Sequence, residues 1–383
     1  MWLSSLRLVN FRNYRGLRLE PQPGVLVFSG HNGQGKTNLL ESVYVLATTR
    51  SPRTSVEREL LSWQAPEDAD LAAVVPPFAR LDGRVRKPSG EIHLELTFSS
   101  NGSSVARGIK VNGLTTRATG LVGQLPVVYF SPEDVELAGG SPTRRRQYLN
   151  LANAQVSKQH LRALQRYNRV LLQRNQVLRQ VRERRQPASA LEPWTEQLIS
   201  LGSQIVAQRV DMLRDINARL PDIHRDLSGG CETLRVDYRS TVGDGSDESF
   251  RGRQAEVAGR EIEQAVSLVG PHRDDFTFVL GDVDLNTYGS RGQQRLAVLA
   301  LKLAEADWMR ASTGDLPVVL LDDMLSELDP RRRSYLLHRI AQPDPARGRQ
   351  VWITTTELDL SPADEYLAAA QRFLIDAGQV RPA

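Results

Sequence analysis

The chain carries, directly after an apolar run at residues 25–28, the glycine-rich sequence Gly30-His31-Asn32-Gly33-Gln34-Gly35-Lys36-Thr37. This sequence fits the pattern G-x-x-x-x-G-K-[ST], in which backbone amides surround the phosphates of a nucleotide. Residues 38–46 continue with helical spacing, so strand, loop and helix follow one another as a phosphate loop requires. We expect Lys36 to contact the β- and γ-phosphates of ATP, and the hydroxyl of Thr37 to ligate Mg²⁺.

A strand that ends in two carboxylates lies near the other end of the chain. Residues 318–321 are apolar, and Asp322 and Asp323 follow them. Open α/β sheets place ligand chemistry at the carboxyl ends of their strands. Adjacent residues of a strand point to opposite faces, so we expect the two carboxylates to differ in role. We predict that Asp322 holds the Mg²⁺ shell and that Asp323 polarises the attacking water. A polar strand end in solvent is the simpler alternative.

Between these stretches lies Ser290-Arg291-Gly292-Gln293-Gln294, which has two interpretations. It suits a capped helix start, because serine is a good N-cap residue and an apolar stripe follows. It is also the signature of ATPases that close two subunits around ATP, since a serine hydroxyl and free helix amides bind an anion. The acidic strand that follows favours the second interpretation. We therefore expect Ser290, Gly292 and Gln293 to bind the nucleotide of a second copy, in an ATP-driven dimer switch of the ABC kind.

Composition is that of an ordinary globular chain, with 383 residues of which 40% are hydrophobic and 25% charged. The length suggests about two to three domains. The longest apolar runs have strand length and the N-terminus resembles a strand, so we expect neither a transmembrane helix nor a signal peptide. Cys231 is the only cysteine, which excludes intrachain disulfides and a cysteine-based zinc site. We expect a cytoplasmic protein.

Positive charge is concentrated in one region of the chain. Residues 141–186 contain eleven Arg, one Lys and a single acid, Glu183, which gives a local charge of +11 against +4 for the whole chain. The remaining residues therefore carry −7. A basic island on an acidic body is typical of a surface that binds a polyanion. The alternative is a solvated helical face, because charge runs alone are weak evidence.

The order of expected elements predicts an interrupted α/β domain. Strands are expected at residues 6–9, 17–19, 25–28, 92–98, 109–111, 127–130, 276–280, 318–321 and 351–354. Residues 51–90 are rich in proline and are expected to be mainly loop. From Pro142 to Pro221 the pattern is helical. The fold class is α/β: an ABC-type P-loop ATPase head, with a mixed sheet and flanking helices, and an inserted, mainly helical second domain. We place the head at residues 1–141 and 263–383 and the insertion at 142–262.

Leucines within the helical region predict how its helices pack. They fall near a 3.5-residue repeat, at Leu161, Leu164, Leu171, Leu172 and Leu178. Asparagines interrupt this repeat, so we expect a short packed helical pair with a break near residues 187–193.

Two further clusters have open interpretations. Gly270-Pro271-His272-Arg273-Asp274-Asp275 is either a metal site built on His272 and the aspartates or a bonded turn that places Arg273 near phosphate. Thr354-Thr355-Thr356 follows an expected strand where many ABC ATPases carry a histidine. A threonine run is also an ordinary strand end.

Several of these blocks together resemble the RecF family of bacterial recombination mediators, which is related to the SMC proteins. The resemblance lies in residues 8–14, 30–37, 270–275, 290–295, 301–305 and 320–329. It implies DNA binding with ATP bound, dimerisation on ATP, slow hydrolysis, and work with RecO and RecR at single-strand gaps. It also implies that Arg12 contacts a nucleotide phosphate. Residues 51–90 and 232–262 have no counterpart in it.

The motifs and the resemblance together predict a DNA-binding ATPase of recombinational repair, with ATP and Mg²⁺ as cofactors. It would load recombinase with RecO and RecR and support fork recovery and the SOS response. We expect catalytic roles for Lys36 and Asp323, and DNA contacts from Arg179, Arg182, Arg184 and Arg185. Whether it is an enzyme in its own right or a weak, DNA-stimulated ATPase used as a switch is left open.

Two rival classes are weighed against this prediction. A transporter ATPase subunit is disfavoured by the long spacing between Lys36 and Asp322 and by Asp323 in place of glutamate. An SMC-type arm protein is disfavoured because the chain has no long heptad region.

Overall fold

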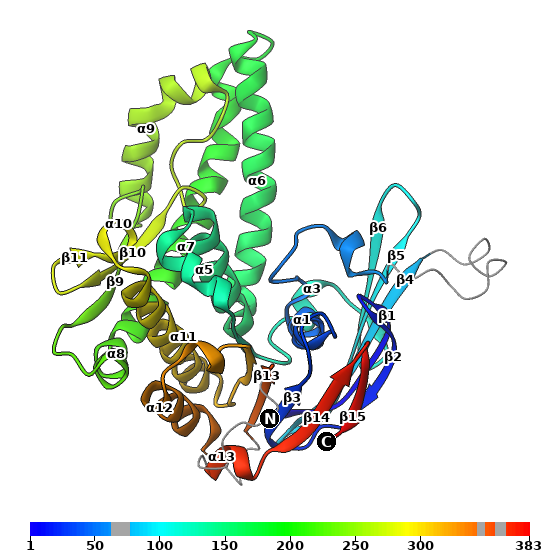
Figure 1. Cartoon of the computed structure of the whole chain (residues 1–383). Coiled ribbons are helices and arrows are strands. Elements are labelled where there is room, and N and C mark those ends of the chain that lie inside the picture. The colour runs from blue at the N-terminus through cyan, green and yellow to red at the C-terminus, as the bar shows by residue number, and fades with distance from the viewer. Residues whose placement is uncertain (63–76, 343–348, 357–364) are drawn as a thin grey trace. The chain divides into compact units, whose positions relative to one another are not determined.

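The computed structural model describes residues 1–62, 77–342, 349–356 and 365–383. These residues form two compact units (Figure 1). The first unit comprises Met1–Asp134 and Glu305–Ala383, and the second comprises Val135–Ala304. Both ends of the chain therefore build the first unit, and the second is an insertion between them.

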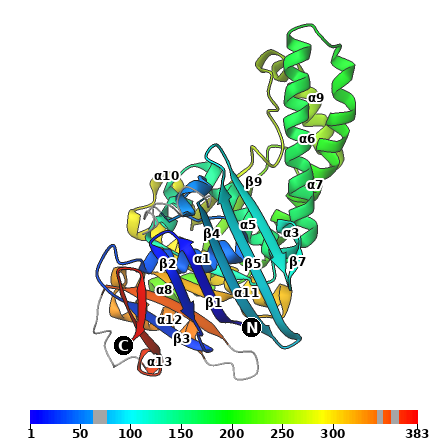
Figure 2. The ribbon, with the colours of Figure 1, turned by 90° about the vertical axis from the view of Figure 1, so that its right-hand side faces the viewer.

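The first unit contains an antiparallel sheet with strand order β2-β1-β4-β5-β6-β7 (Figure 2). Its strands are β1 (Trp2–Phe11), β2 (Tyr14–Leu19), β4 (Phe78–Lys87), β5 (Gly90–Ser100), β6 (Val105–Val111) and β7 (Leu114–Thr115). Side chains alternate along β1, where Leu6 and Leu8 are buried and Arg7 is exposed. This alternation is expected of a sheet with one face against a core. The strands predicted at residues 6–9, 17–19, 92–98 and 109–111 are confirmed.

The prediction of loop over residues 51–90 is wrong at its C-terminal end. Strand β4 occupies ten of these residues, and a 3-10 turn, η1, occupies Glu57–Leu60. Residues 63–76 lie outside the described part of the chain. Strand β4 pairs with both β1 and β5. Strand β1 lies about seventy residues before β4, and β5 follows it directly. The prolines around β4 predict turns, and nothing in the local sequence indicates that these two strands pair with it.

The second sheet of the first unit is mixed, with strand order β15-β14-β3-β13-β12-β8. Its strands are β3 (Gly24–Ser29), β8 (Val127–Phe130), β12 (Val318–Asp322), β13 (Gln350–Thr355), β14 (Gln371–Asp376) and β15 (Gln379–Pro382). All neighbours are parallel except β14 and β15. Every residue of β8, β12 and β13 is buried, as parallel strands covered on both faces require. The predicted mixed sheet is confirmed.

Helix α1 (Lys36–Thr48) packs against strands of both sheets. Its side chains Leu39, Leu40 and Val43 are fully buried in one core that also contains residues of β1, β4, β5 and β12. The first turn of α1 is thereby fixed at the ends of the parallel strands. The other short elements of this unit are α3 (Ala118–Leu121), η2 (Pro132–Val135), η4 (Leu325–Glu327), α12 (Pro330–Ala341) and α13 (Glu365–Ala368).

The second unit is mainly helical. Its helices are α4 (Glu136–Gly139), α5 (Pro142–Val156), α6 (Lys158–Arg182), η3 (Ala188–Leu191), α7 (Glu192–Asn217), α8 (Leu220–Ser228), α9 (Asp247–Gln264) and α10 (Leu285–Tyr288). Helices α6, α7 and α9 pack together (Figure 1). A small antiparallel sheet joins β9 (Leu234–Arg239), β10 (Asp275–Leu280) and β11 (Val283–Asp284). Helix α11 (Arg291–Thr313) begins in this unit and ends in the first.

The domain boundaries expected from the sequence differ from those of the structure. We placed residues 263–383 in the ATPase head, but residues up to Ala304 belong to the second unit. The reason is that β10 pairs along its whole length with β9, and not with the sheet of the head. An isolated apolar strand carries no information about which sheet it joins.

The packing surface of α6 also differs from the predicted leucine repeat. The helical pair and its break are present, but Leu172 is 69% exposed. The buried residues of α6 are His160, Ala163, Tyr167, Val170, Arg174 and Leu178. They recur every three or four residues, which is the spacing of one helix face. In the described part of the chain, no helix is both long and apolar enough to span a membrane.

Candidate functional site

The glycine-rich loop joins the end of β3 to the start of α1, as predicted. Gly35 has φ 116°, and a Cβ there would lie 2.5 Å from the Asn13 amide nitrogen. A Cβ on Gly30 would lie 2.3 Å from the carbonyl oxygen of Ile375. Only glycine fits at these two positions. His31, Asn32 and Gly33 are exposed, so the outer side of the loop is open to a ligand.

Lys36 lies inside the loop. Its ammonium donates hydrogen bonds to the carbonyl oxygens of Gly30 at 2.7 Å and His31 at 2.9 Å. Burial lowers the pKa of Lys36, and the nearby carboxylates of Asp323 and Asp322 oppose this effect. The lysine is thus a buried cation held by two carbonyl oxygens of the loop, at the position from which a phosphate-loop lysine contacts phosphate.

Asp322 ends β12 beside the start of α1, and hydroxyl groups surround its carboxylate. Thr37 Oγ1 donates to Oδ1 at 3.0 Å, Thr354 Oγ1 donates to the same oxygen at 2.8 Å, and the Tyr129 hydroxyl donates to Oδ2 at 2.8 Å. Burial raises the pKa of Asp322, and these hydrogen bonds oppose the rise. The structure therefore brings together Thr37 and Asp322, the two predicted Mg²⁺ ligands.

The donor set around Thr37 fits Mg²⁺. This ion prefers oxygen ligands and is usually held by one or two carboxylates with waters and phosphate oxygens. Thr37 Oγ1, at the end of the phosphate loop, and the Asp322 carboxylate, at the end of β12, supply oxygen atoms that are in contact. The described residues contain no group of three or more His, Cys, Asp or Glu that could hold a metal without a phosphate.

Asp323 lies beyond the end of β12 and differs from Asp322 in backbone and burial. Its φ is 51°, in the left-handed region that aspartate tolerates better than most residues. Its carbonyl oxygen accepts a hydrogen bond from Ser326 Oγ at 2.8 Å. Asp323 is half-buried, whereas Asp322 is buried. Strand β12 ends at Asp322 and the chain turns at Asp323, so the two residues do not alternate along one strand as expected.

Thr354 is a site residue whose sequence context indicated only a strand end. It lies on β13, between the strands that carry the glycine loop and Asp322. Besides donating to Asp322, its hydroxyl accepts a hydrogen bond from the Asp323 amide at 3.0 Å. One buried hydroxyl thereby positions both acidic residues. The available signal was a polar residue at the end of the neighbouring parallel strand.

The model of the RecF/RecN/SMC N terminal domain matches residues 2–371. The DNA replication and repair protein RecF of Herpetosiphon aurantiacus is 41% identical over 395 residues, which cover 100% of both chains. The chain belongs to the RecF family. RecF of Enterococcus faecalis is 40% identical, over 94% of this chain and 93% of that protein.

Solved structures agree with this assignment to the RecF family. The structure of the recombination mediator protein RecF-ATP in the RecFOR pathway has a TM-score of 0.87 and 30% identity, and the match covers 100% of this chain and 97% of that one. The SmcHead bound to the C-winged helix domain of ScpA has a TM-score of 0.56 at 13% identity. The second match shows the fold alone, which is the predicted ABC-type head.

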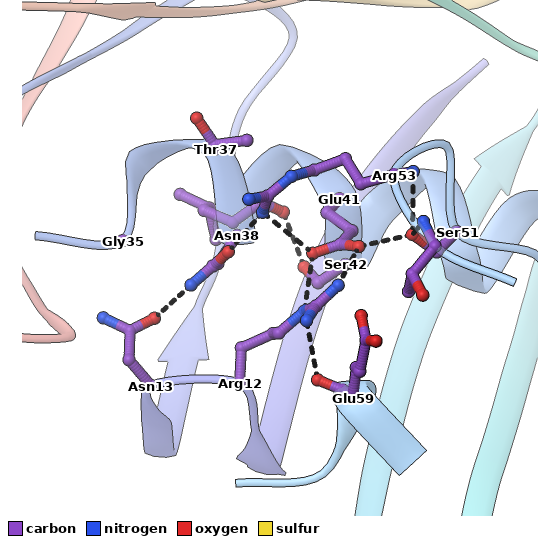
Figure 3. Close-up of polar contacts among 12 residues, drawn as sticks. Arg12, Asn13, Gly35, Thr37, Asn38, Glu41, Ser42, Ser51, Arg53 and Glu59 are labelled. Atoms are coloured by element: carbon purple, nitrogen blue, oxygen red, sulfur yellow. Dashed lines mark hydrogen bonds and ion pairs between the residues drawn. The ribbon is translucent and has the colours of Figure 1, made fainter. Parts of the chain in front are cut away.

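In this RecF-family chain, Arg12 is bonded to protein groups (Figure 3). Its guanidinium donates to both carboxylate oxygens of Glu41, at 2.9 and 2.7 Å, and to the Glu59 carbonyl oxygen at 2.7 Å. Glu41 is fully buried and also accepts from Ser51 Oγ. A buried bidentate pair of this kind is costly to break. The phosphate contact that the resemblance implies for Arg12 stays a prediction.

Asn13 and Tyr14 hold the glycine loop from β2 and the turn before it. Asn13 donates to the Gln34 carbonyl oxygen at 2.9 Å, and the Tyr14 hydroxyl donates to that of Gly35 at 2.9 Å. Asn13 also accepts from the Asn38 amide at 2.8 Å (Figure 3). Neither residue was predicted to support the loop, because the contacts join segments 21 residues apart in sequence.

The signature segment is a capped helix start in the second unit. The Ser290 amide donates to Gln293 Oε1 at 2.9 Å, and the Gln293 amide donates to Ser290 Oγ at 3.3 Å. This reciprocal pair is a capping box. Ser290, Gly292 and Gln293 are all exposed, so a second molecule can reach the start of α11. The structural and functional interpretations of this motif are therefore compatible.

The cluster at residues 270–275 is a bonded turn and not a metal site. Both ring nitrogens of His272 are engaged, with the Tyr167 hydroxyl at 2.7 Å and the Ser267 carbonyl oxygen at 3.1 Å. Burial lowers the pKa of His272 to about 4. Asp274 is fully buried and accepts from Thr241. Arg273 donates to the Ser267 carbonyl oxygen within the second unit. Because His272 and Asp274 are bonded to protein groups, and the described residues contain no cluster of metal ligands, the metal alternative is wrong.

The basic island splits into buried and exposed residues. Arg145 pairs with Asp275 at 2.6 Å, and Arg174 pairs with the fully buried Glu261 at 2.6 Å. These two arginines are part of the packing. The exposed basic side chains of α6 and its C-terminal end are Lys158, Arg162, Arg166, Arg169, Arg179, Arg182, Arg184 and Arg185. Helix α6 contains no Asp or Glu, so its exposed face is uniformly positive.

Proposed function

We propose that this chain is a DNA-binding ATPase of recombinational repair that acts as an ATP-controlled dimer. The proposal rests on one observation above all: Lys36, Thr37 and Asp322 meet at the carboxyl ends of adjacent parallel strands, next to an open glycine loop. Membership of the RecF family supports the same conclusion, because solved relatives include a RecF-ATP structure of the RecFOR pathway.

The chemistry of the site follows from its residues. The loop amides and Lys36 would bind the phosphates of ATP, and Thr37 and Asp322 would hold Mg²⁺. A bound Mg²⁺ neutralises phosphate charge. The three hydroxyl donors on Asp322 orient its carboxylate and oppose the rise in its pKa that burial causes. Asp323, half-buried just beyond the end of β12, would accept a hydrogen bond from the attacking water. It is one methylene shorter than glutamate, so slow hydrolysis is expected.

The switch between monomer and dimer requires a second nucleotide contact. The exposed start of α11 offers Ser290, Gly292 and Gln293, and helix N-termini attract anions. In a head-to-tail dimer these residues would meet the ATP bound by the other copy. Hydrolysis would remove the shared phosphate and release the dimer.

DNA would bind the exposed basic face of the second unit. Phosphate contacts by arginine dominate non-specific DNA affinity. The RecFOR pathway of the solved relative supports action with RecO and RecR. By extension, the dimer would act at gaps, help to load recombinase, and support fork recovery and the SOS response.

Sedimentation of the full chain tests this function in four conditions: with and without Mg-ATP, each with and without duplex DNA. We expect dimer only with ATP, and DNA binding to be strongest with ATP. The Lys36→Ala variant should lose both responses, whereas Lys110→Ala, on an exposed strand position, should keep them. A chain that neither binds ATP nor dimerises would contradict the proposal.

A further inference from the structure

Tyr288 is the most exposed large apolar or aromatic side chain in the described part of the protein. It retains 78% of its accessible surface. It is the last residue of α10, two positions before Ser290. Within the described residues its ring stacks on no other ring and its hydroxyl has no hydrogen-bond partner. Isolated exposed apolar residues need no explanation, so the case for Tyr288 depends on how it is held and on what lies beside it.

The short helix that carries Tyr288 is anchored to β10. The Asp284 carboxylate caps α10 by accepting from the Asn286 amide at 2.9 Å. The Asn286 side chain accepts from the Phe278 amide at 2.9 Å and donates to the Phe276 carbonyl oxygen at 3.4 Å. Phe276 and Phe278 are themselves fully buried. Helix α10 is therefore tied to a core strand at two points.

A second anchor joins α10 to the start of α11. Gln294 donates to the Leu285 carbonyl oxygen at 2.8 Å. A Cβ on Gly289 would lie 2.6 Å from that same oxygen, so only glycine permits the close turn between the two helices. Tyr288 and Ser290 therefore belong to one anchored turn, and their backbone positions are fixed relative to each other.

A rigidly mounted tyrosine is well suited to anchor an interface. Its ring buries a large area while only two torsions lose freedom, and tyrosine is enriched among the residues that dominate binding. The backbone beneath Tyr288 needs no ordering on association, because the anchors above have already fixed it. An unpartnered ring of this kind lowers the cost of binding through preorganisation.

We propose that Tyr288 packs on a second copy of this chain, at the rim of that copy's phosphate loop, and anchors the ATP-dependent dimer. This inference rests on the proposed function. The occupant is argued from the shared turn: only Gly289 separates the two residues, so a body that meets the Ser290 hydroxyl comes within reach of the Tyr288 ring. The proposed ligand of Ser290 is ATP on a second copy. Residues 31–33 of the loop are exposed and available at that rim.

Sedimentation of the full chain in Mg-ATP measures the dimer dissociation constant directly. Tyr288→Ala should weaken dimerisation by about thirtyfold or more, as truncation of a main interface anchor does. Tyr288→Phe should dimerise nearly as well as the parent, because the ring provides the contact. Val283→Ala is the matched control, since Val283 is also an exposed apolar residue of this region, at 45%. It should leave the dissociation constant unchanged.

Two further measurements separate a loss of dimer contact from a loss of nucleotide binding or of folding. Mg-ATP affinity, measured at protein concentrations where the chain is monomeric, should be equal in the parent and Tyr288→Ala. The unfolding midpoint should also be equal, because an exposed ring contributes little to stability. A parent that dimerises with ATP and a Tyr288→Ala variant that dimerises equally well would overturn the inference and leave the proposed function intact.

Three other results would contradict the proposed role of Tyr288. If the parent stays monomeric in ATP, the proposed function itself fails. If Tyr288→Ala loses duplex DNA affinity as a monomer but dimerises normally, the ring binds nucleic acid and the proposed occupant is wrong. If Tyr288→Phe weakens dimerisation as much as Tyr288→Ala does, the contact is made by the hydroxyl group, and packing of the ring is not the anchor.

Discussion

At the scale of single residues, burial separates two carboxylates that are adjacent in sequence. Asp322 is buried under three hydroxyl donors, and Asp323 is half-buried after a left-handed turn. A buried carboxylate stays ionised only if donors or a cation compensate for lost hydration. Asp322 therefore suits a metal ligand, and Asp323 suits a group that meets water.

Substitutions at these two positions should have different effects. Asp323→Asn should trap an ATP-bound dimer, because the metal shell survives while the charge that polarises water is lost. Asp322→Asn should weaken Mg-nucleotide binding itself. Nucleotide affinity, phosphate release and sedimentation measured on both variants check the assignment. Equal defects in all three measurements would show that the two residues share one role.

Thr354 offers a sharper residue-scale test. Thr354→Val keeps the shape but removes the hydroxyl that bonds Asp322 and the Asp323 amide. The unpaired groups should reduce the free energy of unfolding by about 1–3 kcal/mol. Hydrolysis should fall at saturating Mg-ATP. Thr115→Val, at an exposed strand position, is the control. A variant with parental stability and turnover would rule out a positioning role for Thr354.

At the scale of elements, the N-terminus of α11 combines a cap and a candidate ligand site. Ser290→Arg should leave Mg-ATP binding by the monomer intact and abolish the dimer, because the serine would serve the other copy. The lost cap alone should cost about 1 kcal/mol. Ser246→Arg removes an equivalent cap from α9 and should dimerise normally. Loss of nucleotide binding in the Ser290→Arg monomer would show that the signature does not act in trans.

The C-terminal end of α6 provides the test of DNA binding. If the basic surface neutralises about four phosphates per subunit, the log–log salt slope should approach about −3.6. Replacing Arg179, Arg182, Arg184 and Arg185 together by Gln should flatten this slope and weaken binding to all duplex sequences similarly. ATP-dependent dimerisation without DNA should persist.

The control for this test replaces four arginines that all pair with acids, at Arg214, Arg225, Arg235 and Arg251, whereas in the test set such a pair is formed by Arg185, with Glu183 at 3.1 Å. This set should change the slope less, because each charge is offset locally. An unchanged slope in the α6 variant would identify its arginines as a solvated face and place the DNA site elsewhere.

At the scale of the whole molecule, the two units should respond differently to acid. His160 and His272 are buried in the second unit, and burial lowers the pKa of each to about 4 from an ordinary value of 6.5. Between these values the unfolded chain binds more protons, so acid favours unfolding. The penalty is absent well above pH 6.5, grows by up to about 1.4 kcal/mol per pH unit for each histidine as pH falls from 6.5 to about 4, and then levels off.

Unfolding of the second unit, followed at pH 7 and pH 5, checks this expectation. The parent should lose stability at pH 5, and His160→Gln and His272→Gln should each lose less. His93→Gln, in the first unit, is the control and should not alter the response of the second unit. Identical pH dependence in the parent and in both buried-histidine variants would assign the acid sensitivity to other groups.

The sequence alone determined the elements whose signals are local. The order strand, glycine loop and helix needs no distant partner, because backbone conformation and helix amides create the phosphate loop in place. The apolar strand before Asp322 and the capped helix at Ser290 are local signals of the same kind. Full-length similarity to RecF proteins was visible in the same blocks. These features fixed the fold class and the main site residues.

Only the tertiary structure decided what depends on contacts between distant segments. It joined Thr354 and Tyr129 to Asp322 through neighbouring parallel strands. It paired Arg12 with Glu41, assigned β10 to the second unit, and buried two arginines of the basic island. Strand partners, buried pairs and domain boundaries are set by packing across long chain separations, and a local pattern of residues carries no record of which surface it will meet.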